Sequence, residues 1–422
     1  MKKSLRMLSL VLLVCLCFTT LGQVAAVAES DSTTTVTIWA FCDTHANWYQ
    51  WVTDEYTKLH PEVVFDIQVF DNTSMQDKLA VVIAADGEGS PDLVDVEQGM
   101  FPRYMSEEKM CFVPLTERIE SEGIDQLIVM SRENLYTYNG EIYGIEHALC
   151  PVTMAYRMDI FEANGLSYPT TWEEYKADAA LLHEQGIYIA AIPSSALLDH
   201  LPYLRASHND YVDENGNLNL SEQFKELMTD ARDMINDGYF YTYETDEERW
   251  GAIRENNVAS YVAADWGAGW LRDNVPEQEG LWEFSYLPKM TEDASRVSVW
   301  GGTGLCMMKY STVDQDLLWD FMKFSQIDED NCIKKYEMIS LYPVLYSAMD
   351  ACNTPVEYFD GQNLGELWQS LADETPVQTQ ASWRTAFSDA FSVNIYDFLE
   401  GNITIDEFCD LITEAVNNSI AQ

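Results

Sequence analysis

The alternation of strand-like and helix-like segments over residues 33–97 is the feature that most constrains the fold. Each strand candidate is rich in β-branched residues, and each helix candidate carries apolar residues at helical spacing. The segments are, in order, strand 33–41, helix 42–60, strand 63–70, helix 74–86 and strand 91–97. Strands separated by helices in this way predict a parallel sheet with helices packed on its faces.

Residues 164–175, NGLSYPTTWEEY, predict the start of a further helix. Thr171 and Glu174 have the spacing of a capping box, in which the hydroxyl and the carboxylate each bond a free backbone N–H. The helix is expected to begin near Trp172 and to end at Gly186, which suits the left-handed position after a helix. The glutamates here are therefore interpreted as cap and surface residues, not as a catalytic pair.

The first 28 residues have the three-part layout of a secretory signal. Lys2, Lys3 and Arg6 precede an apolar run over 8–18, and small residues then lead to Ala28. The apolar run is shorter than a comfortable membrane span. We therefore expect cleavage after Ala28 and an exported mature protein that is extracellular or held at the cell surface.

A lipid anchor at Cys15 or Cys17 is an alternative form of this export. Lipid attachment normally requires a small residue directly before the cysteine, and here those residues are Val14 and Leu16. Simple cleavage of the signal is therefore the preferred interpretation.

The seven remaining cysteines predict neither a disulfide framework nor a zinc centre. Their number is odd, their spacing is wide and irregular, and no pair has CxxC spacing. Most are expected to be buried as small apolar residues. The seven are Cys42, Cys111, Cys150, Cys306, Cys332, Cys352 and Cys409.

Residues 213–224 resemble a calcium-binding loop only in part. Leu218 stands where the loop needs glycine, and Phe224 stands where it needs a bidentate glutamate. A turn near Asn215 that leads to a helix capped by Ser221 is the better interpretation. No metal and no cofactor are expected from the sequence.

The chain is strongly acidic and long enough for two domains. It has 70 Asp and Glu against 24 Lys and Arg, which gives a formal net charge of −46 over 422 residues. Such a surface repels polyanions, so nucleic acid is not an expected partner. With 47% hydrophobic residues, the chain also has ample material for folded cores.

Three longer stretches show a resemblance to a known family. Residues 143–175 contain a Tyr-Gly pair, then F-x-x-x-G-L and P-x-T-W-E-E; residues 299–325 contain a glycine-rich strand and an aromatic helix; residues 341–349 form a short return with a proline. Together they resemble the sugar-type extracellular solute-binding proteins of bacterial ABC importers, which are family 1 or maltose-binding-protein-like. His147 and Ala148 depart from the proline that is common after the Tyr-Gly pair.

The resemblance implies an α/β, two-lobed periplasmic-binding-protein fold with type II-like topology. Three crossover segments would act as hinges, and a ligand would lie in the cleft between the lobes. Closure of the lobes around the ligand would then be the signal to a transporter. The expected boundaries are 35–146 with 304–343 for the N-terminal lobe, 149–299 with 348–422 for the C-terminal lobe, and 143–148, 299–303 and 341–345 for the hinges.

By the same resemblance, the expected function is non-catalytic capture of a carbohydrate and its delivery to ABC transporter permease subunits. An oligosaccharide is the favoured ligand, and a monomer is the expected state. A sugar presents C–H faces and rings of hydroxyls, so its site needs aromatic platforms and polar side chains. The 12 Trp and 23 Tyr of this chain are a large supply of such platforms.

The segment 263–270, AADWGAGW, is the most informative site candidate. It lies at the end of a predicted strand, where α/β folds expose ligand-binding groups. Trp266 and Trp270, which stand beside glycines, are predicted to be stacking platforms. Asp265 is predicted to be a polar contact.

Other candidates lie at the ends of strands in the first lobe. Polar side chains directly after a strand suit the recognition of hydroxyl groups. Trp48 lies on the first predicted helix and is open to either a site or a core role. These candidates are Asp43, Thr44, Trp48, Glu97 and Gln98.

The last candidates lie at the crossovers or are suggested by the resemblance. Tyr203 and Trp383 match positions that often face the cleft in the family. Arg384 is either a polar companion of Trp383 or a partner in a surface ion pair. The crossover candidates are His147, Trp300 and Tyr342.

Two other functions stay open at this point. The same fold binding a polyamine would use acidic cleft residues such as Asp43, Glu97 and Asp265. A secreted glycoside hydrolase would need two carboxylates at a set separation, and neither HExxH nor GxSxG occurs in the chain. The class of ligand that raises the melting temperature separates these possibilities.

Overall fold

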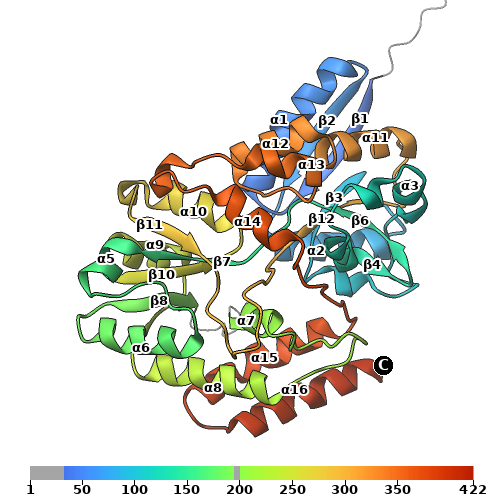
Figure 1. Cartoon of the computed structure of the whole chain (residues 1–422). Coiled ribbons are helices and arrows are strands. Elements are labelled where there is room, and N and C mark those ends of the chain that lie inside the picture. Colours follow the sequence, from blue (N-terminus) through green and yellow to red (C-terminus); the bar gives the residue numbers. More distant parts are fainter. Residues whose placement is uncertain (1–32, 194–199, 422) are drawn as a thin grey trace, which may run out of the picture.

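The fold is a mixed α/β arrangement built around two five-stranded sheets (Figure 1). It comes from a computed structural model that describes residues 33–193 and 200–421. The expected signal segment 1–28, with Cys15 and Cys17, lies outside the described residues. In Figure 1 the first sheet lies at the top and right of the view, and the second sheet lies at the left.

The first sheet has the strand order β2-β1-β3-β12-β6. β1 pairs in parallel with both β2 and β3, which confirms the parallel arrangement predicted from the alternating segments. β12 runs antiparallel to β3 and to β6. The strands are β1 (Thr34–Ala40), β2 (Val63–Val69), β3 (Leu93–Glu97), β6 (Gly144–Glu146) and β12 (Thr303–Met307).

The second sheet has the strand order β11-β7-β10-β8-β9. β10 pairs in parallel with β8 and antiparallel with β7, and β8 pairs in parallel with β9. The strands are β7 (Thr153–Arg157), β8 (Tyr188–Pro193), β9 (Phe240–Tyr243), β10 (Val258–Ala263) and β11 (Trp282–Ser285). A small separate hairpin is formed by β4 (Thr137–Tyr138) and β5 (Glu141–Ile142).

Helices cover both sheets and bury their apolar faces against them. Those that pack with the first sheet are α1 (Asp43–Leu59), α2 (Asn72–Ala84), α3 (Thr116–Ser121), α4 (Met130–Glu133), α11 (Gln315–Gln326) and α12 (Glu329–Ile339). The others are α5 (Met158–Ala163), α6 (Trp172–His183), α7 (Leu201–Ala206), α8 (Glu222–Asn236), α9 (Asp246–Arg254), α10 (Trp266–Asn274), α13 (Tyr346–Met349), α14 (Leu364–Ala372), α15 (Arg384–Leu399) and α16 (Ile405–Ile420). Short 3-10 turns are η1 (Phe101–Tyr104), η2 (Ile124–Gln126), η3 (Asn134–Tyr136), η5 (Pro276–Gln278), η6 (Asp350–Cys352) and η7 (Glu357–Phe359).

Local chemistry sets several helix ends as the sequence predicts. The Thr171 and Glu174 side chains form the predicted capping box at the start of α6. The turn before α8 is held by the Asp213 carboxylate, which accepts the backbone N–H of Asn215, and Ser221 caps that helix. The capping-box and turn interpretations are therefore confirmed.

The sequence predicts Asp43 or Thr44 as the N-cap of α1 and Pro61 as its stop, and the start of the helix corrects the first of these two predictions. The N-cap is Cys42, with no hydrogen bond from its side chain, and Asp43 is the first helical residue. Asp43 thus places its charge in the first turn, where exposed N–H groups carry partial positive charge. The helix ends at Leu59, two residues before Pro61, as predicted.

The backbone passes between the two sheets at points far apart in the sequence. Residues 147–152 connect β6 to β7, residues 286–302 connect β11 back to β12, and residues 340–345 connect α12 to α13. A further segment, 373–383, connects α14 to α15, which both pack in the cores of the second sheet. The numerical domain boundaries given above stay a prediction.

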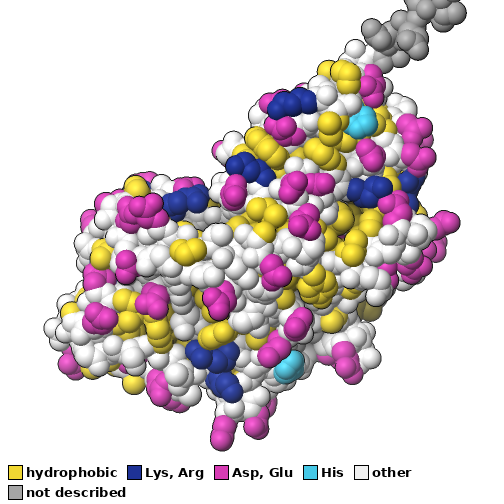
Figure 2. All heavy atoms as spheres, turned by 45° about the horizontal axis from the view of Figure 1, so that its top comes forward, with side chains coloured by type: hydrophobic (Ala, Val, Ile, Leu, Met, Phe, Trp, Pro, Cys, Tyr) yellow, Lys and Arg dark blue, Asp and Glu magenta, His cyan; other side chains and the backbone are white. Residues whose placement is uncertain are grey.

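The cysteines are mostly buried, as predicted, and the visible surface is acidic, as the net charge implies. Within 33–193 and 200–421, every cysteine is free; six are buried, and Cys42 is partly buried. Among these described residues, no helix has both the length and the apolar composition that a membrane crossing needs. Figure 2 shows Asp and Glu side chains spread over the visible face, with few Lys or Arg between them.

Candidate functional site

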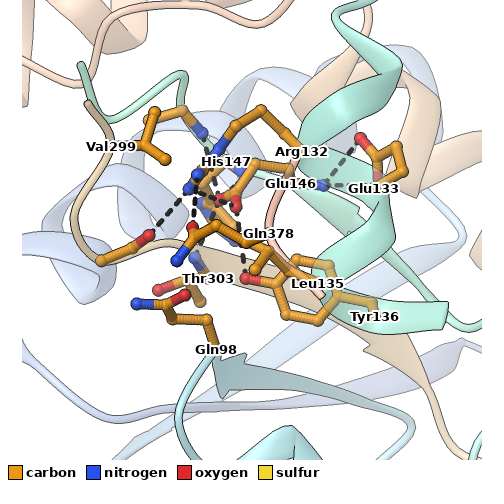
Figure 3. Close-up of polar contacts among 12 residues, drawn as sticks. Gln98, Arg132, Glu133, Leu135, Tyr136, Glu146, His147, Val299, Thr303 and Gln378 are labelled. Atoms are coloured by element: carbon orange, nitrogen blue, oxygen red, sulfur yellow. Dashed lines mark hydrogen bonds and ion pairs between the residues drawn. The ribbon is translucent and has the colours of Figure 1, made fainter. Parts of the chain in front are cut away.

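A buried ion pair lies at the point where two of the crossings begin and end. The Arg132 guanidinium in α4 bonds the Glu146 carboxylate at the end of β6, at 3.2 Å. Neither side chain is exposed by more than 1%. Figure 3 shows this pair with the polar groups around it.

Glu146 fixes two crossing segments through backbone hydrogen bonds. Its Oε1 accepts the N–H of His147 at 2.9 Å and the N–H of Thr303 at 2.8 Å. His147 opens the crossing from β6 to β7, and Thr303 closes the crossing from β11 to β12. One carboxylate therefore ties both segments to the edge of the first sheet.

Arg132 extends the same network to two more segments. It donates to the Gly301 carbonyl at 2.7 Å and to the Gln378 side chain at 3.2 Å. Gly302 has φ +137°, and a Cβ there would lie 2.5 Å from both Arg132 and Glu146, so a glycine is required. The backbone before β12 is thus shaped around the buried pair.

Glu133 lies beside this pair and is predominantly protonated at neutral pH. Burial, with the nearby charge of Glu146, raises the pKa of Glu133 to about 8. Its carboxyl group faces the backbone N–H of Glu146 at 3.3 Å. The side chain therefore adds little negative charge to a region that already holds Glu146.

A second buried polar cluster joins His147 to Asp95 in β3. Asp95 Oδ1 lies 3.0 Å from His147 Nε2, and Asp95 Oδ2 lies 2.8 Å from His45 Nδ1. Tyr49 donates its hydroxyl to Asp95 Oδ1 at 2.5 Å. Burial lowers the pKa of His147 to about 4, so its ring is neutral at pH 7 and can donate to the carboxylate.

Three of the predicted aromatic residues meet at the end of β10. The Trp266 ring lies 4.5 Å from the Trp270 ring and 5.5 Å from the Trp300 ring, measured between centroids. Trp266 and Trp300 are partly buried, and Trp270 is exposed by 37%. The backbone at Gly301 has φ +80° and passes so close that a Cβ would contact Trp266 Nε1 at 3.4 Å.

Asp265 holds the backbone at the start of α10, the helix that carries Trp266 and Trp270. Its carboxylate accepts the backbone N–H of Trp266 at 2.9 Å and that of Tyr342 at 2.7 Å. The residue is fully buried, and burial raises its pKa to about 7. Asp265 and Tyr342 thus connect β10 to the third crossing, a positioning role that the prediction of a ligand contact did not include.

Glu97 and Gln98, at the end of β3, approach the segment between α14 and α15. Gln380 donates to the Gln98 carbonyl at 2.9 Å and accepts from Arg384 at 2.5 Å. Burial raises the pKa of Glu97 to about 7, and the positive charge of Arg384 opposes that rise. The structure therefore brings these four residues together.

The structure corrects the surface ion-pair alternative for Arg384. The side chain is exposed by only 9%, and it donates to the Tyr211 hydroxyl at 2.8 Å. A buried guanidinium with two neutral acceptors acts as a bridge between elements.

Three predicted platforms lie inside hydrophobic cores. Trp48 is completely buried in the core of the first sheet, and its ring stacks on Trp51. Tyr203 is exposed by 3% and packs against Trp172, 4.9 Å between centroids. Trp383 is exposed by 4% in the same core as Tyr203, so in this conformation none of the three rings offers an open face.

Asp43 and Thr44 occupy the first turn of α1. Asp43 is exposed and Thr44 is partly buried, so both are accessible at the end of β1. The cluster around Asp95 lies one turn further on, through His45 and Tyr49. Their role as ligand contacts stays a prediction.

Sequence reasoning missed the residues that hold the crossings together. The pair of Arg132 and Glu146 connects residues fourteen positions apart. From the far end of the chain, Gln378 reaches Arg132 in α4, and Gln380 reaches the Gln98 carbonyl directly after β3. No short motif marks such contacts. The only local signal is the polar segment 375–380, TPVQTQ, between two helices.

The comparisons with known proteins agree with this architecture. The family described as bacterial extracellular solute-binding protein matches residues 51–358, which is most of the chain. The chain belongs to this family. The expectation drawn from the resemblance is therefore confirmed at the level of the family.

Two curated relatives are similar over most of their length. An arabinooligosaccharide-binding protein of Halalkalibacterium halodurans is 25% identical over 87% of this chain and 85% of the relative. An arabinooligosaccharide-binding protein of Bacillus subtilis is 26% identical over 81% of this chain and 82% of the relative. Both are oligosaccharide-binding proteins by name.

A solved structure supports the fold. An ABC substrate-binding protein from Listeria monocytogenes in complex with cycloalternan superposes with a TM-score of 0.76 at 17% identity. The match covers 92% of this chain and 99% of that chain. The two-lobed solute-binding fold expected for this chain is confirmed.

Proposed function

We propose that this protein binds an oligosaccharide between its two lobes and delivers it to the permease subunits of an ABC importer. The observation that supports this best is the meeting of Trp266, Trp270 and Trp300 beside the second crossing. Aromatic faces of this kind suit the C–H faces of sugar rings. They lie where one lobe passes into the other, so a bound sugar would contact both.

Buried polar atoms with unmet hydrogen-bonding capacity lie around the same crossings. Within the described residues, Gln98 Oε1, His147 Nδ1 and the Tyr342 hydroxyl have no hydrogen-bond partner. Such atoms are costly unless water or a ligand bonds them. A ligand rich in hydroxyl groups can act as donor and acceptor to each.

The proposed binding residues are those that remain accessible or unsatisfied near the crossings. Asp43, Thr44 and Glu97 supply polar groups from the first lobe, and the tryptophan group supplies stacking surface from the second. The raised pKa of Glu97 gives it a substantial protonated fraction near pH 7, and a carboxylic acid can donate as well as accept. This weakens the case for a polyamine, which would need fixed negative charge.

The two curated relatives bear the name arabinooligosaccharide-binding protein, so arabino-oligosaccharides are the first ligands to test. Calorimetric titration of the signal-free protein with arabino-, galacto- and malto-oligosaccharides of graded length is the direct experiment. Polyamines and amino acids complete the panel. We expect saturable binding of one oligosaccharide class without formation of a product.

The same experiment separates the competing functions. A polyamine that binds while every sugar fails would contradict the proposal and favour the other solute class. Shortening of a bound oligosaccharide, followed by chromatography, would indicate a hydrolase. Mass measurement of the mature protein from its native host tests export, because cleavage after Ala28 gives a defined N-terminus. Light scattering of the purified protein tests the proposed monomer.

A further inference from the structure

Three side chains that commonly bind metals converge at the edge of the first sheet. They come from three different elements: His45 from α1, Asp95 from β3 and His147 directly after β6. One ligand atom from each lies within 4.8 Å of the others. We propose that these residues bind a divalent transition-metal ion, with Zn²⁺ as the best match, and that the Tyr49 hydroxyl is the fourth ligand.

The donor atoms now lie at hydrogen-bond distances around one carboxylate. Asp95 Oδ2 lies 2.8 Å from His45 Nδ1, Asp95 Oδ1 lies 3.0 Å from His147 Nε2, and the Tyr49 oxygen lies 3.1 Å from that Nε2. Metal–ligand bonds of about 2.0 Å place neighbouring tetrahedral ligand atoms roughly 3.3 Å apart. One ligand atom from each residue lies within 4.8 Å of the others, so metal entry requires the side chains to replace their hydrogen bonds and to turn toward one ion.

The charge balance of the cluster favours a cation. Asp95 is completely buried, and in the described part of the chain it forms no ion pair with a lysine or arginine. The buried Lys335 contributes positive charge to the same region without contacting the carboxylate. A carboxylate buried without a direct countercharge is costly, and hydrogen bonds from neutral donors compensate only part of that cost. A divalent ion between Asp95 and the two imidazoles would supply the missing positive charge.

The kind of donor selects the kind of metal. Two imidazole nitrogens with one carboxylate suit Zn²⁺ and similar first-row ions, whereas Ca²⁺ and Mg²⁺ prefer sites built from oxygen alone. The two imidazole rings are stacked, 4.8 Å apart and only 6° from parallel. Each ring bonds one oxygen of the same carboxylate, and at least one ring must turn out of the stack before a single ion can contact both nitrogens.

The proposed metal ligand on His147 is Nε2, whereas Nδ1 of the same ring is the atom available to a sugar hydroxyl. The site joins α1, β3 and the start of the first crossing, three segments separated by about fifty residues each along the chain. Such ligands leave no local motif, which is why neither the cysteine spacing nor the search for a calcium-binding loop predicted a metal. A bound ion would stiffen the base of the first crossing.

The test begins with the wild-type signal-free protein after metal removal by a chelator. Titration with Co²⁺, followed by visible absorption, reports a four-coordinate nitrogen–oxygen site, and Zn²⁺ is then added to displace the Co²⁺. We expect one Co²⁺ per chain and complete displacement by Zn²⁺. If no absorption develops and dialysed protein retains no metal by mass spectrometry, the proposal is wrong.

Two variants locate the site. His45→Gln and His147→Gln should each weaken Zn²⁺ binding by at least about 10- to 100-fold. The control is His60→Gln, because His60 is an exposed histidine beside Glu62 and Asp320, 3.5 and 3.9 Å away. Unchanged affinity in the first two variants, or an equal loss in the control, would overturn the assignment.

A measurement on the wild type covers the case in which a variant fails to fold. Heteronuclear NMR of the ¹⁵N-labelled protein reports the ring nitrogens of each histidine, including the buried ones. One equivalent of Zn²⁺ should shift the ring-nitrogen resonances of His45 and His147 and leave those of His60 unchanged. Unchanged His45 and His147 resonances would contradict the proposed site.

Discussion

The two lobes present different chemistry to the region where the chain crosses between them. The first lobe contributes buried charge and imidazole, in the pair of Arg132 with Glu146 and in the cluster around Asp95. The second lobe contributes aromatic surface, in Trp266 and Trp270, supported by one buried carboxyl group. The difference indicates two roles. Buried polar contacts of the first lobe hold the crossing segments in place, and aromatic side chains of the second lobe supply the proposed stacking surface for a sugar.

Removing the buried guanidinium should have the largest effect on stability. Arg132→Met leaves the Glu146 carboxylate buried without its partner, and breaking such a pair from one side costs about 3–5 kcal/mol. Urea unfolding at pH 7 measures the loss. The control Lys58→Met removes an exposed pair with Glu55, for which we expect a change below about 1 kcal/mol.

If Arg132→Met lowers the free energy of unfolding as little as the control does, the buried pair of Arg132 and Glu146 does not hold the crossing segments in place. The double variant Arg132→Met with Glu146→Gln sharpens the test. It removes both charges, so it should recover part of the lost stability.

The buried carboxyl group of the second lobe should make stability depend on pH. The pKa of Asp265 is raised to about 7, against an ordinary value near 4, so the folded protein binds a proton that the unfolded chain releases between these values. Its contribution is fully present below pH 4 and is lost as the pH rises through 7. Asp265→Asn should flatten this fall by up to about 1.4 kcal/mol per pH unit.

Urea unfolding at several pH values between 4 and 8 measures this slope. Asp273→Asn is the control, because Asp273 is an exposed carboxylate on the same helix, α10. If the slopes of wild type and Asp265→Asn agree, Asp265 titrates as an ordinary acid, and the second lobe has no buried proton of this kind.

The platform itself should govern affinity more than stability. Trp266→Ala should weaken oligosaccharide binding about tenfold or more, which corresponds to about 1.4 kcal/mol. Trp270 is more exposed, so Trp270→Ala should have a smaller effect in the same direction. Tyr396→Ala removes an exposed aromatic residue on the outer helix α15 and should leave affinity unchanged.

Calorimetric titration of the three variants with the same oligosaccharide gives the comparison. If all three variants lose the same affinity, the loss reports a general change in the folded protein and not the removal of a stacking surface. No loss in Trp266→Ala would remove the tryptophan group from the proposed site.

The elements that the sequence predicted well are those set by neighbours in the chain. The capping box of α6 and the end of α1 before Pro61 follow from local spacing. Both depend on backbone groups within a few residues, so short patterns are sufficient to find them. The parallel pairing of β1 with β2 follows instead from the alternation of strand and helix segments.

The site was harder to predict because its residues act through distant partners. Trp48 and Tyr203 have the composition of platforms, yet each is buried by helices that the local sequence does not specify. Arg132 and Glu146 look like ordinary surface charges until the fold places them under the crossings. Residue type alone cannot separate a core tryptophan from an accessible one.

The smallest expected effect separates local stability from the function of the crossings. Thr171→Ala removes the hydroxyl that accepts the Glu174 backbone N–H at the start of α6, which should cost about 1 kcal/mol in urea unfolding. The cap belongs to the outer part of the second lobe, so the oligosaccharide affinity of the folded variant should equal that of the wild type. A matched loss of affinity would show that binding responds to any weakening of the second lobe, and the effect of Trp266→Ala would then no longer identify a platform.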